Sequence, residues 1–179
     1  MKKSVIGIVD AQANAERIVD EVQRVGVLPG EISVLMPDKT GTRDFAHEHH
    51  TKAPEGAVAG AGAGGLVGGT IGLLAGIGAL AIPGVGPFIA AGPLLAALSG
   101  AAAGATVGGI AGALIGLGIP ELEAKTYEGK LKSGNILVAV HVESDDVAKR
   151  VKAIYQEQKA HDISVTSDSS VPKQERVGT

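Results

Sequence analysis

The side chains best able to bind a metal ion gather in a polar stretch, PDKTGTRDFAHEHHTKAPE, which covers residues 37–55. The candidate ligands in it are His47, Glu48, His49 and His50. Imidazole and carboxylate groups are common ligands of zinc and related metals. On a helix, however, His49 and His50 point apart, and no second ligand cluster stands out elsewhere in the sequence. A solvated connector is therefore the favoured interpretation, and a metal site or a pH-sensitive histidine patch is the alternative.

Catalytic chemistry has few candidate residues. The chain has no cysteine, which excludes disulfides, thiolate metal sites and cysteine nucleophiles. Asp10, His141 and Glu143 lie on or beside predicted strands, but they form no recognisable acid pair, triad or phosphate loop. Glycine strings of the GxGxxG type occur without a preceding strand or a downstream acidic residue, so they do not indicate a nucleotide site. We therefore expect no enzymatic activity and no cofactor.

Nucleic acid is an unfavourable partner for this composition. The formal net charge is −3, and the aromatic residues are two phenylalanines and two tyrosines. Such a chain offers neither a basic surface for phosphates nor a stacking platform for bases.

The dominant feature is a charge-free segment from Gly56 to Pro120, which contains 20 of the 27 glycines in its 65 residues. In two series within it, glycine recurs at every fourth position. The first series is Gly60, Gly64, Gly68, Gly72 and Gly76. The second series is Gly100, Gly104, Gly108, Gly112 and Gly116. Because the second repeats the first after 40 residues, the segment is an internal duplication.

This pattern predicts a pair of membrane-type helices, at about Val58–Ile82 and about Leu94–Ile119, joined by a proline-rich turn. Small residues four apart lie on one helix face and allow a second backbone to approach closely. Glycine costs an isolated helix in water about 0.8–1 kcal/mol per residue relative to alanine, whereas hydrocarbon enforces helix formation. The stripe drifts around the helix, so we expect contacts with the hairpin mate and with another copy of the chain. One alternative is a monotopic hairpin that stays buried without crossing the bilayer. Another is a hairpin buried in a soluble core, which the scarcity of residues to cover it disfavours.

Lysines flank the charge-free segment and predict its orientation. Lys52 precedes it, and Lys125, Lys130 and Lys132 follow it. By the positive-inside rule, both flanks face the cytoplasm. We therefore predict that the polar domain lies on the cytoplasmic side of the membrane.

The two ends of the chain each predict a β-α-β unit. In the first unit, SVIGIVD is a strand, AQANAERIVDEVQRVG is an amphipathic helix and residues 31–36 form the second strand. In the second unit, residues 135–143 are the strongest strand, a helix follows with Ser144 as its N-cap, and residues 162–168 close the unit. Together they predict an α+β, ferredoxin-like β-α-β-β-α-β domain with helices on one face. The glycine-zipper hairpin is inserted at its middle.

The predicted organisation has six parts. They are the first β-α-β half (1–36), a polar connector (37–55), the hairpin (56–120), a charged connector (121–134), the second half (135–168) and a flexible tail (169–179).

The segments HTKAPEGA, IPGVGPFIAAGP and GIPELEAKTYEGKLKSG resemble a bacterial group of general or heat-induced stress proteins with a glycine-zipper hairpin. The arrangement is also similar to that of the two-helix membrane subunit of the alternative quinol-oxidising complex. The first resemblance implies no established activity and no catalytic residues. We expect a non-enzymatic, membrane-associated stress protein that forms a homo-oligomer through its hairpins and shapes or stabilises the membrane. A scaffold subunit of a membrane redox complex and a small-ligand sensor on a membrane anchor are the alternatives.

Overall fold

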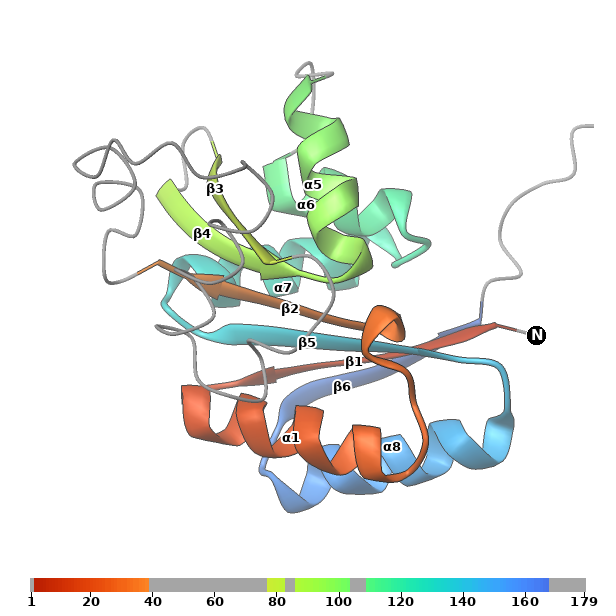
Figure 1. Cartoon of the computed structure of the whole chain (residues 1–179). Helices are drawn as coiled ribbons and strands as arrows, with labels where there is room; N and C mark the ends of the chain where they lie inside the picture. The colour runs from red at the N-terminus through yellow and green to blue at the C-terminus, as the bar shows by residue number, and fades with distance from the viewer. Residues whose placement is uncertain (1, 39–76, 83–85, 104–108, 168–179) are drawn as a thin grey trace, which may run out of the picture.

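The computed structural model describes residues 2–38, 77–82, 86–103 and 109–167 of the 179-residue chain. These residues build three layers, with a mixed α+β composition and an antiparallel sheet in the middle (Figure 1). Helices cover both faces of the sheet, α1 and α8 on one side and α5, α6 and α7 on the other. Among the described residues, no helix combines the length and the hydropathy that crossing a membrane requires.

The elements follow one another in a mixed order of helices and strands. In the first part they are β1 (Lys3–Val9), α1 (Gln12–Arg24), a short 3-10 turn η1 (Pro29–Glu31) and β2 (Ile32–Pro37). The middle part contains β3 (Ile77–Ile82), β4 (Gly86–Ala91), α5 (Pro93–Ala103) and α6 (Gly109–Gly116). The last part contains α7 (Glu121–Lys132), β5 (Ile136–Val142), α8 (Asp145–Glu157) and β6 (His161–Ser167).

The six strands of the described part pair in the order β3-β4-β2-β5-β1-β6, and every pair is antiparallel. The two ends of the chain interleave, because β5 lies between β1 and β2. Val138 on β5 is opposite Gly7 on one side and Val34 on the other. The strands and helices predicted for both ends are present, with bounds that differ by one to a few residues.

The central strands are buried on both faces. Along β5, Ile136, Val138 and Val140 face the core under α1 and α8. Leu137 and Ala139 face the opposite core, under α5, α6 and α7. A strand covered on both sides reads as a continuous apolar run and not as an alternation, which explains the sequence ILVAV. The prediction that helices cover one face only is therefore wrong.

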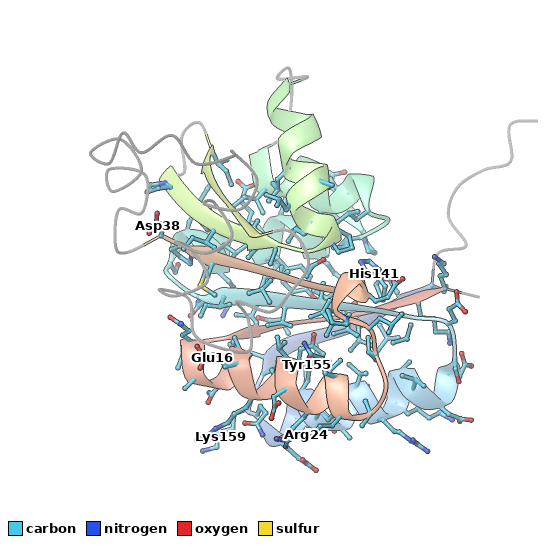
Figure 2. The ribbon with its side chains drawn as sticks, viewed as in Figure 1. Glu16, Arg24, Asp38, His141, Tyr155 and Lys159 are labelled. Carbon is cyan, nitrogen blue, oxygen red and sulfur yellow. The ribbon has the colours of Figure 1, made fainter. Side chains whose placement is uncertain are left out.

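Tyr155 of α8 is buried in the first core, which lies between the sheet and helices α1 and α8 (Figure 2). Its buried hydroxyl donates to the carbonyl oxygen of Val138 at 3.0 Å, and that of Val5 lies 3.4 Å away. Burial raises the pKa of this phenol well above its ordinary value. Gly7 makes room for the ring, since a Cβ there would lie 3.2 Å from the Tyr155 ring. One side chain thus joins α8 to β1 and β5.

The predicted first helix is wrong at its C-terminal end. Ile77–Ile82 forms strand β3, and the predicted turn contains strand β4, which pairs with β2 from Val34↔Ala91 to Pro37↔Phe88. Gly86, expected in a loop between two helices, begins β4 with a φ of +112°. The physical reason is that the edge of β2 offers backbone partners to an apolar segment without helical periodicity. The rest of the predicted helix, residues 58–76, lies outside the described residues.

The predicted second helix is not a single helix. Its described residues form α5 and α6, which pack against each other on the second face of the sheet. Gly109 has a φ of +49°, which a right-handed helix cannot continue through. The N-terminus of α5 is tied to the sheet, where the Leu94 amide donates to the buried Ser33 hydroxyl at 3.2 Å. The described residues of the predicted second helix therefore pack within the domain, where Leu94, Leu98, Ile110 and Leu114 are buried.

Glu128 of α7 joins the last two helices of this layer. One carboxylate oxygen accepts the Ala111 amide in the first turn of α6 at 2.7 Å, and the other accepts from Lys132 at 2.6 Å. Burial of the carboxyl raises its pKa, but the hydrogen bonds from Lys132 and Ala111 outweigh burial, and the pKa of Glu128 is lowered from its ordinary 4.5. The charged form is therefore the one that the folded state favours.

We expect Glu128→Gln to lower the free energy of unfolding by about 1 kcal/mol at pH 7, because the amide keeps an acceptor but loses the charge. A carboxyl whose pKa is lowered on folding stabilises the fold at pH values above its pKa in the unfolded state. This contribution is lost as the pH falls through its pKa in the folded state. The difference between the two proteins should therefore shrink below pH 4.5. Urea unfolding of both at pH 7 and at about pH 3 measures it, and an unchanged difference would contradict the capping role.

Candidate functional site

A cleft of about 870 Å³ opens between the second face of the sheet and the turn from α6 to α7. Its floor comes from three strands, with Ser4 on β1, His141 on β5 and Thr166 on β6. Its roof is the chain from Ile115 to Glu121. A cleft of this size falls within the range that binds small molecules in proteins.

Strand register produces the polar floor. Ser4 is opposite both His141 and Thr166, so the three side chains form a row across the sheet. The Ser4 hydroxyl oxygen lies 2.8 Å from Nδ1 of His141. The next pair on this face of β1 and β5, toward the middle of the sheet, is Ile6 and Ala139, and both are apolar and buried. The row therefore marks where the apolar core ends and the cleft begins (Figure 2 labels His141).

The roof combines apolar side chains with glycine. Leu117 and Ile119 line it, and Pro93 at the start of α5 adds an apolar wall. Gly116 and Gly118 also line it, and a Cβ added at either position would meet nothing within 4 Å. The absence of side chains at these two positions therefore leaves space that forms part of the cleft.

Three charged side chains of the described residues line the cleft. Glu121 is held by Lys125, whose ammonium lies 2.6 Å away, and this hydrogen bond lowers the pKa of Glu121. Lys2 and Glu31 have no ion-pair partner among the described residues. Apart from the paired Glu121, the cleft thus presents one positive and one negative side chain together with hydroxyl and imidazole groups.

The glycines predicted to pack helices are only partly described. Gly100 lies in α5, and Gly112 and Gly116 lie in α6. The first series, together with Gly104 and Gly108, lies outside the described residues. Of the described members, Gly116 lines the cleft, a position that the four-residue spacing did not indicate.

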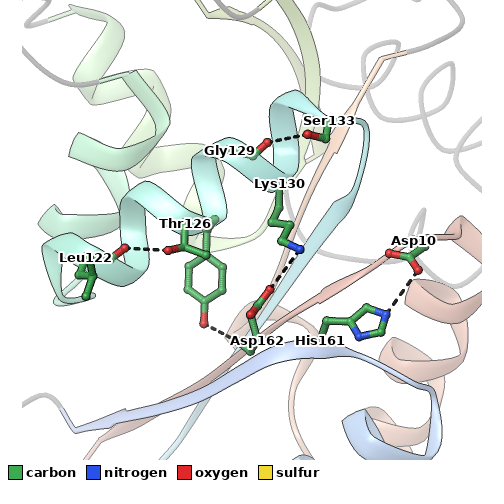
Figure 3. Close-up of polar contacts among 9 residues, drawn as sticks. Asp10, Leu122, Thr126, Gly129, Lys130, Ser133, His161 and Asp162 are labelled. Carbon is green, nitrogen blue, oxygen red and sulfur yellow. Dashed lines mark hydrogen bonds and ion pairs between the residues drawn. The ribbon is translucent and has the colours of Figure 1, made fainter.

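The other candidate residues are dispersed. His47, Glu48, His49 and His50 lie outside the described residues, within which no three metal-binding side chains gather. Asp10 pairs with His161 at 3.4 Å (Figure 3). It follows β1 at the end opposite Ser4, about 20 Å away at roughly 3.4 Å per residue. Asp10 and His141 therefore belong to opposite ends of the sheet.

The roof is anchored to the sheet through α7. The buried Tyr127 hydroxyl donates to the carbonyl oxygen of Asp162 at 2.8 Å, and Lys130 lies 3.8 Å from the Asp162 carboxylate (Figure 3). The Ser164 hydroxyl donates to Glu123 at 2.7 Å. These contacts hold α7 on β6 and fix one side of the cleft.

The signal for this cleft in the sequence is weak. The polar residues of its floor come from positions 4, 141 and 166, which only the sheet brings together. A polar residue that interrupts an apolar strand, as His141 does in ILVAVHV, is the one local sign.

No protein-family model matches this chain, and no curated protein or solved structure matches it either. The residues of the cleft and the charge-free segment are therefore the features from which function is inferred.

Proposed function

We propose that this protein is a non-enzymatic, membrane-associated stress protein that self-assembles through glycine-zipper packing, with its α/β domain on the cytoplasmic side of a bacterial inner membrane. The observation that carries the proposal is the sequence from Gly56 to Gly76, which has no charged residue and has glycine at every fourth position from Gly60. Its 21 residues match the length of about 20 that one membrane-spanning helix needs.

The domain is proposed to be ferredoxin-like. The order β2-β5-β1-β6, the antiparallel pairing and the placement of α1 and α8 on one face support this assignment. The charge-free segment departs from that plan, since it contributes β3 and β4 to the sheet and α5 and α6 to its second face.

Packing energies favour lipid contact by the first half of the charge-free segment over lipid contact by the second half. Leu94, Leu98, Ile110 and Leu114 are almost completely buried against the sheet. Moving α5 and α6 into lipid would keep these four side chains in an apolar environment, but it would expose to water the sheet side chains that pack against them, such as Ile6, Leu35 and Leu137. Exposing each of these costs about 1.5–3 kcal/mol, and the sum is comparable with the roughly 5–15 kcal/mol stability of a whole domain. We therefore assign membrane contact to the first glycine series, and the second series remains with the domain.

Leucine at Gly68 tests this assignment. If the glycines pack helices of different copies, Gly68→Leu should still float with lipid vesicles and should lose the higher-order species seen by crosslinking. Leucine favours membrane insertion, so a loss of assembly cannot result from weaker insertion. Gly129→Leu is the control, because Gly129 is exposed on α7 and a Cβ there meets nothing within 4 Å.

Two outcomes would refute the proposal. Wild-type protein that remains with the soluble fraction beside vesicles would remove the membrane role. A size distribution that Gly68→Leu leaves unchanged would remove the assembly mechanism and leave the segment as a simple anchor.

A further inference from the structure

The cleft contains two charged side chains, Lys2 and Glu31, that the proposed membrane attachment does not use. Lys2 and Glu31 both line it, and among the described residues neither forms an ion pair. Glu31 is partly buried, so its carboxylate is less well solvated than a surface one. A ligand that supplies an ammonium group to Glu31 and a carboxylate to Lys2 would satisfy both charges.

The positions of these groups restrict the size of the ligand. Glu31 immediately precedes β2, and Lys2 immediately precedes β1, with β5 between the two strands. Two strand spacings separate them by roughly 10 Å, and both side chains are long, so their charged ends can approach a small molecule bound between them. The hydroxyls of Ser4 and Thr166 add hydrogen-bond donors for a carboxylate on the floor.

The roof adds an apolar requirement. Leu117, Ile119 and Pro93 face the same cleft, and apolar groups placed there would be removed from water. Gly116 and Gly118 leave the space that such a group would fill. The cleft therefore combines a polar floor, a positive side chain and a negative side chain with an apolar roof.

We propose that this cleft binds a small zwitterion with an aliphatic group, of the chemical class of the apolar α-amino acids. Glu31 accepts from the ammonium group, Lys2 and the floor hydroxyls bind the carboxylate, and the aliphatic group lies under Leu117 and Ile119. The binding involves no covalent step.

Calorimetric titration of the full chain with three probes tests the site. L-leucine carries both charges, 4-methylpentanoate lacks the ammonium group, and 3-methylbutylamine lacks the carboxylate. Leucine should bind at least about tenfold more tightly than either analogue, since each analogue loses a charge-assisted hydrogen bond. Equal affinity for all three, or no heat of binding with leucine at about 10 mM, would overturn the proposal.

Variants separate the cleft from other binding surfaces. Gly116→Leu should abolish leucine binding, because it adds a side chain at a position that lines the cleft and where a Cβ meets nothing within 4 Å, while Gly129→Leu should bind as wild type does. Thermal unfolding of both variants checks that they fold. Glu31→Gln should weaken leucine about tenfold and leave 4-methylpentanoate unchanged. Binding that Gly116→Leu preserves would place the ligand elsewhere and refute the site.

Discussion

Gly92→Ala should lower the free energy of unfolding by about 3 kcal/mol or more, because it combines two separate costs. Gly92 has a φ of +74°, which residues with a Cβ rarely adopt. A Cβ at this position would also overlap the carbonyl oxygen of Ile32 in the sheet. Since the overlapping atoms belong to backbone, relief requires a shift of β2 or of the turn that begins α5.

Gly26→Ala is the matched control for this prediction. Gly26 follows α1 with a φ of +98°, but a Cβ there meets nothing within 4 Å. It should therefore show only the cost of the left-handed conformation, about 1–2 kcal/mol. Urea unfolding of both variants measures the difference. Equal effects would contradict the close approach of the charge-free segment to β2, and with it the placement of α5 on the sheet.

Leu114→Ala should lower the free energy of unfolding by about 2–5 kcal/mol. Leu114 is completely buried in α6, in the core that α5, α6 and α7 form on the sheet. Truncation removes apolar contacts and leaves a cavity that the neighbouring side chains fill only in part. The experiment is chemical unfolding of the full chain, monitored through a signal that reports on the α/β domain.

The adjacent residue provides the control. Ile115 is 42% exposed, so Ile115→Ala should change the free energy of unfolding by less than about 1 kcal/mol. A segment that left the domain for lipid would show no such contrast, since both side chains would then contact the same apolar environment. Equal effects of the two substitutions would therefore contradict the packing of α6 against the sheet.

Local patterns determined the elements at both ends of the chain. The amphipathic spacing of Ile18, Val19 and Val22 predicted α1, and these side chains are buried in the first core. Ser144 was predicted as the N-cap of α8, and its hydroxyl accepts the Asp146 amide at 3.3 Å. Such features need only neighbours within one or two turns, so a single sequence contains enough information to place them.

Local patterns did not determine the secondary structure of the charge-free segment. Ile77–Ile82 contains only Ile, Gly, Ala and Leu, which suits a helix in lipid as well as a strand beside an apolar edge. The choice depends on whether β2 has an edge to pair with and whether the second face of the sheet needs a cover. The continuous apolar run ILVAV of β5 carried that information, as did the run VLM of β2, because a strand with one exposed face would alternate.

The cleft was decided entirely by tertiary structure. Ser4, His141 and Thr166 are far apart in the sequence, and antiparallel register alone places them in one row. A shift of one residue in either pairing would turn one of these side chains to the opposite face. The sequence by itself therefore determined the helices and strands at both ends and the absence of charge in the middle. The sheet decided where the middle packs and which polar residues meet, since both outcomes depend on contacts between residues distant in the chain.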